Sequence, residues 1–121
     1  MILVDTSVWV DHLRKRESAL ERLLGAGMVL IHPFVIGELA CGNMKHRETI
    51  LPLLKSLPMA KVAIDDEVLL YIEKNALMGR GIGYIDVHLL TAVALTGATG
   101  LWTRDKRLHS VAALLGKVWM E

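Results

Sequence analysis

The stretch that decides the fold is Met1-Ile2-Leu3-Val4-Asp5-Thr6-Ser7, in which apolar residues give way to an acid and two hydroxyls. A short apolar run with polar ends is typical of a strand buried on both faces of a parallel sheet. Thr6 or Ser7 is a good N-cap for the amphipathic run that follows, so we expect a helix to begin there. Asp5 then lies at the carboxyl end of a buried strand, which is the edge where open α/β sheets bind their ligands.

Size and composition describe a single domain with a substantial core. The chain has 121 residues and no linker, repeat or low-complexity segment, so we expect one domain over residues 1–121. Apolar residues make up 53% of it, slightly more than in an ordinary soluble domain, which points to a surface buried in a dimer or against a partner. The formal net charge of +1 predicts no strong general attraction to nucleic acids or membranes.

Several features favour a cytoplasmic protein without a membrane segment. Cys41 is the only cysteine, so nothing requires an oxidising compartment. The first apolar run has no basic flank and is interrupted by Asp5, which is unlike a signal peptide. The stretch 87–103 contains glycines and threonines and falls short of the roughly 18 apolar residues of a membrane span.

Along the chain, short apolar runs alternate with amphipathic ones. We expect strands at 2–4, 28–31, 100–103 and, as an edge, 118–120, while 61–64 is either a strand or an extended link. Helices are expected at 33–41, 47–57, 65–77, 85–95 and 108–115, after two helices in the first 24 residues. Each connection is long enough for a parallel crossover. The fold class expected is therefore α/β, with three layers and a central, mostly parallel sheet of four or five short strands.

Four acids lie in or beside these apolar segments: Asp5, Glu38, Asp86 and Asp105. Asp5 and Asp105 each follow an expected buried strand, so both should appear at the same edge of a parallel sheet. Each alone has a structural explanation, as a helix cap or, for Asp86, as a first-turn acid favoured by the helix dipole. Glu38 is harder to explain, because burying an unpaired acid among apolar helix residues costs several kcal/mol.

A divalent cation would resolve the repulsion among these acids if they converge. Without one, the like charges raise each other's pKa and protonate some of the carboxyl groups. A set of oxygen donors with no cysteine and no required histidine suits Mg²⁺ or Mn²⁺. Such ions can activate a bound water and hold the oxygens of a phosphodiester. The hydroxyls of Thr6, Ser7 and Thr103 lie beside the acids, where they can orient a carboxylate or a water.

Three segments give the chain a family likeness. They are residues 5–14 (Asp-Thr-Ser-Val-Trp-Val-Asp-His-Leu-Arg), 83–90 (Gly-Tyr-Ile-Asp-Val-His-Leu-Leu) and 101–108 (Leu-Trp-Thr-Arg-Asp-Lys-Arg-Leu). Together with Glu38 they resemble the PIN-domain ribonucleases, and in particular the VapC toxins of toxin–antitoxin pairs. The resemblance extends over nearly the whole chain and keeps the order and spacing of the motifs.

The resemblance implies a single PIN domain that binds Mg²⁺ or Mn²⁺ and cuts RNA. The family's acidic places, which are its metal ligands, fall on Asp5, Glu38, Asp86 and Asp105, and its hydroxyl places fall on Thr6 or Ser7 and on Thr103. Many PIN proteins carry a further acid two residues after the last one, where this chain has Arg107. A second metal site would then be weak or completed by substrate phosphate. The reaction expected is attack of a metal-activated water, which leaves a 5′-phosphate and a 3′-hydroxyl.

A local excess of cations suggests how RNA is held. Arg104, Lys106 and Arg107 surround Asp105, and Arg80 stands in a glycine-rich loop. Beside catalytic acids they would meet phosphates, although a solvated basic helix face explains them equally well. The resemblance further implies a tRNA or ribosomal RNA substrate, a homodimer, and a neutralising antitoxin of the VapB type that docks its C-terminal segment in a groove.

Three other functions fit parts of the pattern. A receiver-type phosphoacceptor domain would need an acidic pair after the first strand, but Thr6 follows Asp5 here. A phosphatase of the Asp-x-Asp class would need an acid where Ser7 stands. A catalytically silent binding module remains open, and it predicts that removing the Asp5 carboxylate leaves RNA intact and toxicity unchanged.

Overall fold

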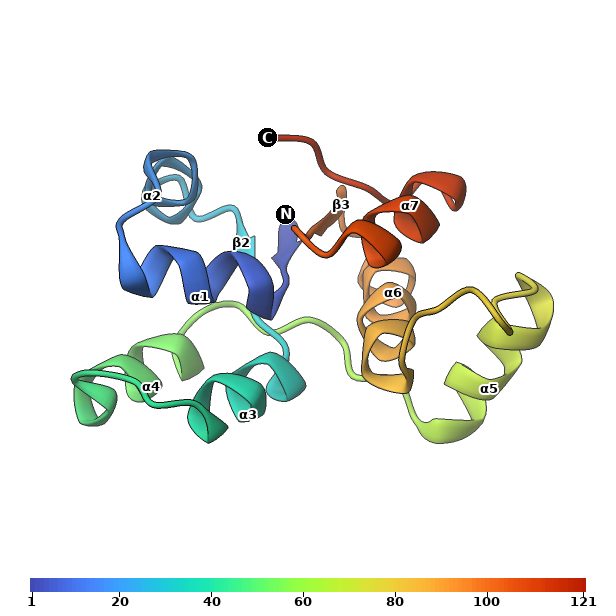
Figure 1. The fold of residues 1–121 in the computed structure, drawn as a ribbon, viewed down its shortest axis with the longest axis horizontal. Coiled ribbons are helices and arrows are strands. Elements are labelled where there is room, and N and C mark those ends of the chain that lie inside the picture. The colour runs from blue at the N-terminus through green and yellow to red at the C-terminus, as the bar shows by residue number, and fades with distance from the viewer.

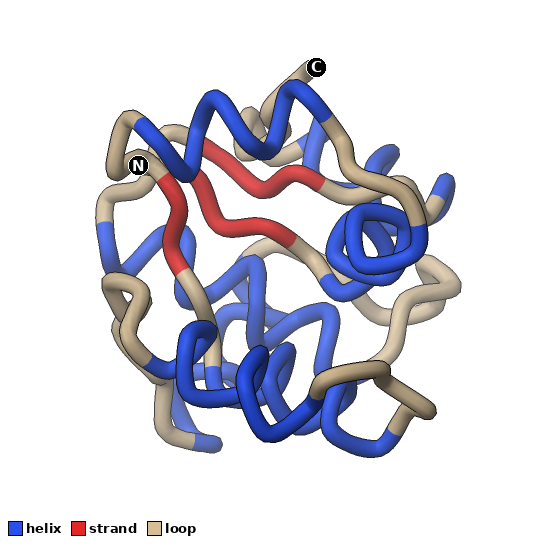
Figure 2. Tube along the Cα trace, turned by 90° about the vertical axis from the view of Figure 1, so that its left-hand side faces the viewer, coloured by secondary structure: helices blue, strands red, loops and turns tan.

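The computed structural model describes all 121 residues and centres on a small parallel sheet. Its strands are β1 (Ile2–Val4), β2 (Val29–Leu30) and β3 (Gly100–Trp102), in the order β2–β1–β3. Figure 2 shows the three strands side by side, with helices around them. β1 is central, with Leu3 paired to Leu30 on one side and to Leu101 on the other, which explains why its residues are almost wholly buried.

The sheet has fewer strands than the expected four or five. At one edge Ile31 forms a single parallel bridge with Met59, and at the other Leu101 forms one with Val118. Neither outer segment continues as a strand. Pro58, next to Met59, has no N–H to donate to a ladder, which accounts for the first case. Residues 61–64 are an extended link.

Seven helices surround the sheet. They are α1 (Thr6–Arg14), α2 (Ser18–Gly25), α3 (Pro33–Cys41), α4 (Arg47–Lys55), α5 (Asp65–Lys74), α6 (Tyr84–Thr96) and α7 (Lys106–Leu114). Figure 1 shows α1 and α2 on one side of the strands and α6 and α7 on the other, which is the expected three-layer α/β arrangement. α3 packs against both α1 and α4. None of the seven is both long enough and apolar enough to cross a membrane.

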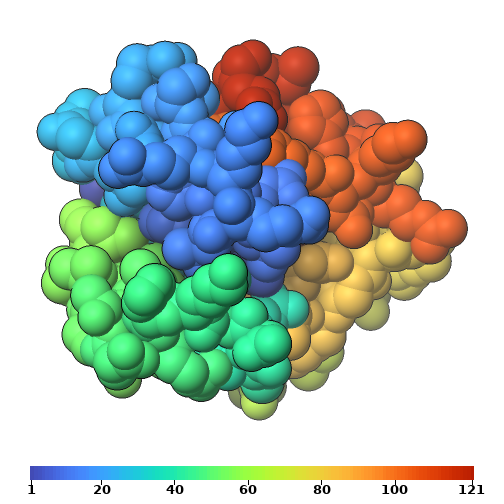
Figure 3. Space-filling model, turned by 60° about the vertical axis from the view of Figure 1, so that its left-hand side comes forward, coloured from blue at the N-terminus to red at the C-terminus, as the bar shows by residue number.

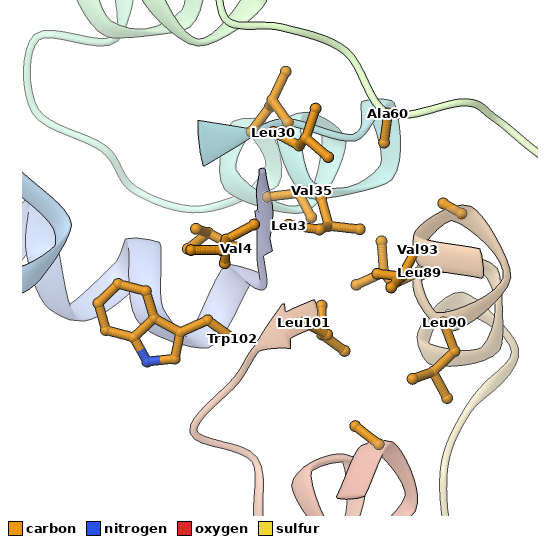
Figure 4. Packing of buried hydrophobic residues seen from close by; sticks show 14 of the residues in the cluster. Leu3, Val4, Leu30, Val35, Ala60, Leu89, Leu90, Val93, Leu101 and Trp102 are labelled. Atoms are coloured by element: carbon orange, nitrogen blue, oxygen red, sulfur yellow. The ribbon is translucent and has the colours of Figure 1, made fainter. Parts of the chain in front are cut away.

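The core lies on both faces of the sheet because successive strand residues point in opposite directions. Leu3 and Leu101 point toward Leu89 of α6, whereas Val4 and Trp102 point toward α1 (Figure 4). α6 is buried at every position from 87 to 93, as expected for a helix packed under a sheet. The residues that end the strands are thereby held in fixed positions at the carboxyl edge of the sheet.

Candidate active site

The four acids come from four separate elements at this edge. Asp5 follows β1 directly and is the N-cap residue of α1, and Asp105 follows β3 by three residues and is the N-cap of α7. Glu38 lies on α3, the helix that follows β2, and Asp86 lies in the first turn of α6. In Figure 3 the blue N-terminal segment borders the teal and green α3–α4 region on one side and the orange C-terminal segment on the other.

Asp5 is the most firmly held of the four. Its side chain is buried, and its Oδ2 accepts hydrogen bonds from Ser7 Oγ at 2.8 Å and from Thr103 Oγ1 at 2.7 Å. Ser7 Oγ accepts the backbone N–H of Arg104 at 3.0 Å, and Thr103 Oγ1 accepts that of Asp105 at 3.1 Å. These bonds join the segment after β1 to the segment after β3. The hydroxyls of Ser7 and Thr103, both named from the sequence, therefore lie beside Asp5.

The third hydroxyl, that of Thr6, serves a different acid. Thr6 Oγ1 donates to Glu38 Oε1 at 2.7 Å and so links α1 to α3. The expectation that Thr6 or Ser7 caps α1 is wrong, because Asp5 occupies that position and its side chain makes no capping bond. The concern that Glu38 is buried is also wrong. Val35 and Leu39, one helical turn apart, face the core, and Glu38 lies on an exposed face of α3.

Asp86 is affected by the charges of the other three acids. It is partly buried, and its Oδ2 accepts the backbone N–H of Gly83 at 3.1 Å. Burial raises the pKa of Asp86 above its ordinary value, the Gly83 N–H opposes this, and the charges of Asp5, Asp105 and Glu38 raise the pKa further. The charges of the other three acids thus reach Asp86, which is consistent with the predicted convergence of the four carboxylates.

Each carboxylate has one oxygen held by the protein and one that accepts no hydrogen bond from it. The held atoms are Oδ2 of Asp5, Oε1 of Glu38, Oδ2 of Asp86 and Oδ1 of Asp105, the last accepting the Leu108 N–H at 2.9 Å. No lysine, arginine or histidine forms an ion pair with any of the four. Carboxylates that ligate metals are commonly oriented by such hydrogen bonds.

This donor set fits a hydrated divalent ion better than a compact protein cage. No three of the His, Cys, Asp and Glu side chains lie close enough to form a ready cluster of ligands. Mg²⁺ keeps several waters and uses few direct carboxylate ligands, so it does not need such a cluster. The free oxygens of the four acids are the atoms that would hold it.

The guanidinium of Arg104 bonds to three acids outside the candidate site. Nη1 donates to Asp11 at 2.8 Å and to Glu17 at 2.9 Å, and Nε donates to Glu121 at 3.1 Å. The group also lies over the ring of Trp102, 5.6 Å from its centroid. Its hydrogen bonds and Coulomb attraction to these acids raise the pKa of Arg104, so it stays charged and neutralised. The fold thus commits the guanidinium to these three acids, and only the backbone N–H of Arg104 bonds to a residue of the candidate site.

A groove lies beside Glu38, at a place that was not predicted from the sequence. It has a volume of about 510 Å³ and lies between α1 and the α3–α4 connection. Its lining includes Val10 and Leu13 of α1, which are apolar yet exposed. The signal was present in the sequence, since these two residues lie three apart on one face of an amphipathic helix.

Known proteins are similar to this chain in sequence. Residues 2–114 match the PIN domain family. The chain is 49% identical over 116 residues to Ribonuclease VapC32 of Mycobacterium tuberculosis, which covers 96% of this chain and 94% of that protein. It is 34% identical over 110 residues to Ribonuclease VapC1 of Methanocaldococcus jannaschii, covering 88% and 76%.

A solved structure shows the same fold at lower identity. Mycobacterium tuberculosis VapC20, a toxin that cleaves the sarcin–ricin loop, superposes with a TM-score of 0.63 at 18% identity over 100% of this chain and 99% of that one. The four acids at the sheet edge lie within the part of the chain that matches the family model. The chain belongs to the PIN-domain family, among the VapC ribonucleases.

Proposed function

We propose that this chain is a Mg²⁺- or Mn²⁺-dependent endoribonuclease that acts as the toxin of a toxin–antitoxin pair on tRNA or ribosomal RNA. The observation that carries the proposal is the set of four carboxylates, each with one oxygen held, one oxygen free and no cation opposite. The 49% identity to a ribonuclease supports the same reaction here. Family membership also excludes the receiver-type and phosphatase alternatives.

The residues of the chain prepare the site for this chemistry. The metal, when bound, supplies the positive charge that activates a water for attack on the phosphodiester. Ser7 and Thr103 fix Asp5, so that its free oxygen keeps one direction. Thr6 does the same for Glu38. Asp86 has a raised pKa, and binding of a cation in place of a proton removes the repulsion that raises it. Hydrolysis leaves a 5′-phosphate and a 3′-hydroxyl.

Cleavage of RNA by the purified chain tests the enzyme. With Mg²⁺ or Mn²⁺ it should cut RNA, and EDTA should stop the reaction. Asp5→Asn should reduce cleavage at least about 10³-fold with an unchanged circular dichroism spectrum, because the metal loses its best-held ligand. Asp66→Asn is the matched control, since Asp66 is an exposed acid on α5 with no side-chain hydrogen bond, and it should cleave as the wild type does. Full activity of the Asp5 variant would overturn the assignment of Asp5 to the site. Failure of the wild type to cut RNA would support a silent binding module instead.

The proposed toxin role requires a partner and has its own test. Expression of the chain alone should arrest growth, and co-expression of its VapB-like antitoxin should restore it. We place the antitoxin's C-terminal segment in the groove beside Glu38. Val10→Asp should then abolish neutralisation and keep cleavage, whereas Leu53→Asp, on the exposed face of α4, should change neither. Harmless expression of the wild type would contradict the role.

Cytoplasmic location and homodimer formation are also part of the proposal. Fractionation of cells should recover the chain with the cytoplasm. Sedimentation of the purified chain should show a dimer, which would account for the high apolar content. A monomer at all concentrations tested would contradict the dimer and leave the enzyme proposal unchanged.

A further inference from the structure

A second pocket, lined by cations, lies between α7 and the loop that precedes α6. It has a volume of about 340 Å³ and is lined by Arg80, Lys106, Arg107 and Ser110, together with Val111 and Leu114. Arg80 comes from the glycine-rich loop between α5 and α6, and the other residues come from α7. The pocket's lining residues are close in sequence to two of the four acids, Asp105 and Asp86. Lys106 follows Asp105 directly, and the Arg80 loop leads into Gly83, which holds Asp86.

The three cations of this pocket are not neutralised within the fold. No acid lines the pocket, and none of the three forms a salt bridge. The only hydrogen bond made by their charged groups is from Arg80 Nε to the carbonyl of Ala76, at 3.1 Å. Arg104, in contrast, is surrounded by carboxylates. Like charges gathered without acids raise the local concentration of anions, so the pocket is built to receive one.

The loop is shaped to admit the side chain of Arg107. Gly81 has a φ of +79°, which side-chain-bearing residues rarely adopt. A Cβ on Gly81 would lie 3.0 Å from Arg107 Cδ and 3.2 Å from its Nη1. Glycine at position 81 therefore allows the Arg107 side chain to pack against the loop. Packing against Gly81, and not an ion pair, holds the guanidinium in place.

We propose, on the basis of the ribonuclease function proposed above, that this pocket binds a backbone phosphate of the RNA strand adjacent to the one being cut. A guanidinium donates two parallel hydrogen bonds to phosphate oxygens, and an ammonium adds a third donor and a charge. Contacts of this kind fix the register of the strand without reading its sequence. The pocket thus supplies the backbone affinity that the net charge of +1 does not.

Binding of RNA by an inactive, metal-free protein isolates this step from catalysis. The probe is a short fluorescein-labelled single-stranded RNA, titrated with the Asp5→Asn protein in EDTA and followed by anisotropy at several salt concentrations. Lys106→Ala and Arg107→Ala should each weaken binding roughly 3- to 10-fold and lower the slope of log K against log salt by about 0.7. Arg22→Ala, which removes an exposed cation from α2, is the matched control and should leave both quantities unchanged.

Cleavage kinetics of variants that keep Asp5 separate the pocket proposal from the ribonuclease function on which it rests. Arg107→Ala should raise KM roughly 3- to 10-fold with little change in kcat, as loss of a substrate-positioning contact does. Arg107→Asp, which installs the acid of many relatives, should raise KM further. If the wild type cleaves RNA but Arg107→Ala keeps its KM and salt slope, or Arg107→Asp is the more active variant, the pocket proposal is overturned. Failure of the wild type to cleave any RNA overturns the function, while the binding experiment still tests the pocket.

Discussion

The hydroxyl of Thr103 makes two bonds at once, donating to Asp5 and accepting the N–H of Asp105. Thr103→Val keeps the shape of the side chain and removes both bonds. We expect kcat for RNA cleavage to fall about 10-fold or more, because residues that orient ligands matter nearly as much as the ligands. The free energy of unfolding should fall by about 1–2 kcal/mol, since Asp5 Oδ2 then accepts only the hydrogen bond from Ser7.

Thr91 provides the matched control for this substitution. It is equally buried, but its hydroxyl donates only to the Val87 carbonyl within α6. Thr91→Val should leave cleavage unchanged. Single-turnover cleavage and urea unfolding of the two variants make the comparison. Equal loss of kcat in both would show that the effect of Thr103 is general destabilisation and not orientation of Asp5.

Asp86→Asn should abolish cleavage and yet stabilise the metal-free protein. Because the pKa of Asp86 is raised in the folded state, ionisation of this carboxyl destabilises the fold as pH rises from the unfolded pKa through the folded one. The amide keeps an acceptor for the Gly83 N–H and removes the charge. The free energy of unfolding should rise by an amount on the order of 1 kcal/mol at neutral pH. This increase should shrink toward acid pH, where Asp86 of the wild type is also uncharged. Thermal unfolding in EDTA across this pH range measures it, and a loss of stability at pH 7 would contradict the electrostatic explanation.

At the scale of elements, the sequence was sufficient where local pattern and burial agree. The strand predicted at 2–4 is confirmed, and the strand and helix predicted at 100–103 and 85–95 correspond to β3 and α6 to within one residue at each end. Each of these segments is buried and therefore strongly apolar in sequence. At the sheet edges the prediction was less accurate: the edge strand expected at 118–120 is a single bridge at Val118, and the other edge is a single bridge at Met59. Such a bridge depends on the position of a neighbouring strand and leaves no periodicity in the sequence. α7 begins at Lys106, two residues before the predicted start, because Asp105 acts as its cap as well as a site acid.

Gly100 lets β3 approach the C-terminal segment, which makes it a test of how that edge is packed. A Cβ at this position would lie 2.9 Å from the carbonyl oxygen of Lys117 and 2.9 Å from the carbonyl carbon of Val118, both backbone atoms that cannot rotate away. Gly100→Ala should therefore destabilise the protein by about 1–3 kcal/mol. Gly37→Ala is the control, since Gly37 lies inside α3 with open space around it, and it should stabilise by about 0.5–1 kcal/mol. Urea unfolding measures both, and a neutral Gly100→Ala would show that the edge can open.

At the scale of the whole molecule, the identities of the site residues were predictable but their contacts were not. The three hydroxyls named from the sequence all bond to acids named with them, Ser7 and Thr103 to Asp5 and Thr6 to Glu38. Which hydroxyl holds which acid follows only from the fold, since Thr103 and Asp5 are 98 positions apart in the chain. The charges near Arg104 in the sequence did not reveal its partners. The acids that neutralise it come from α1, the α1–α2 connection and the C-terminus.

Arg104 thus joins distant parts of the chain, and its removal tests that role against RNA binding. Arg104→Ala would leave Asp11, Glu17 and Glu121 facing one another without a cation. We expect a loss of about 1–2 kcal/mol of stability at neutral pH, allowing for the solvent screening of its partly exposed partners. Arg16→Ala, which breaks the exposed pair with Glu21, should cost less than about 0.5 kcal/mol.

The loss caused by Arg104→Ala should depend on pH in a defined direction. The hydrogen bond from Arg104 is the main reason that the pKa of Glu121 is lowered in the folded state. The stabilisation is therefore present above the unfolded pKa of Glu121 and is lost as pH falls through the lower folded value. Urea unfolding at neutral and acid pH should show the difference between variant and wild type shrinking toward acid. RNA affinity of Arg104→Ala should stay at the wild-type value, because its guanidinium is already occupied. If Arg104→Ala instead lost as much RNA affinity as Lys106→Ala, Arg104 would be an RNA-binding residue, as its position next to Asp105 in the sequence predicts.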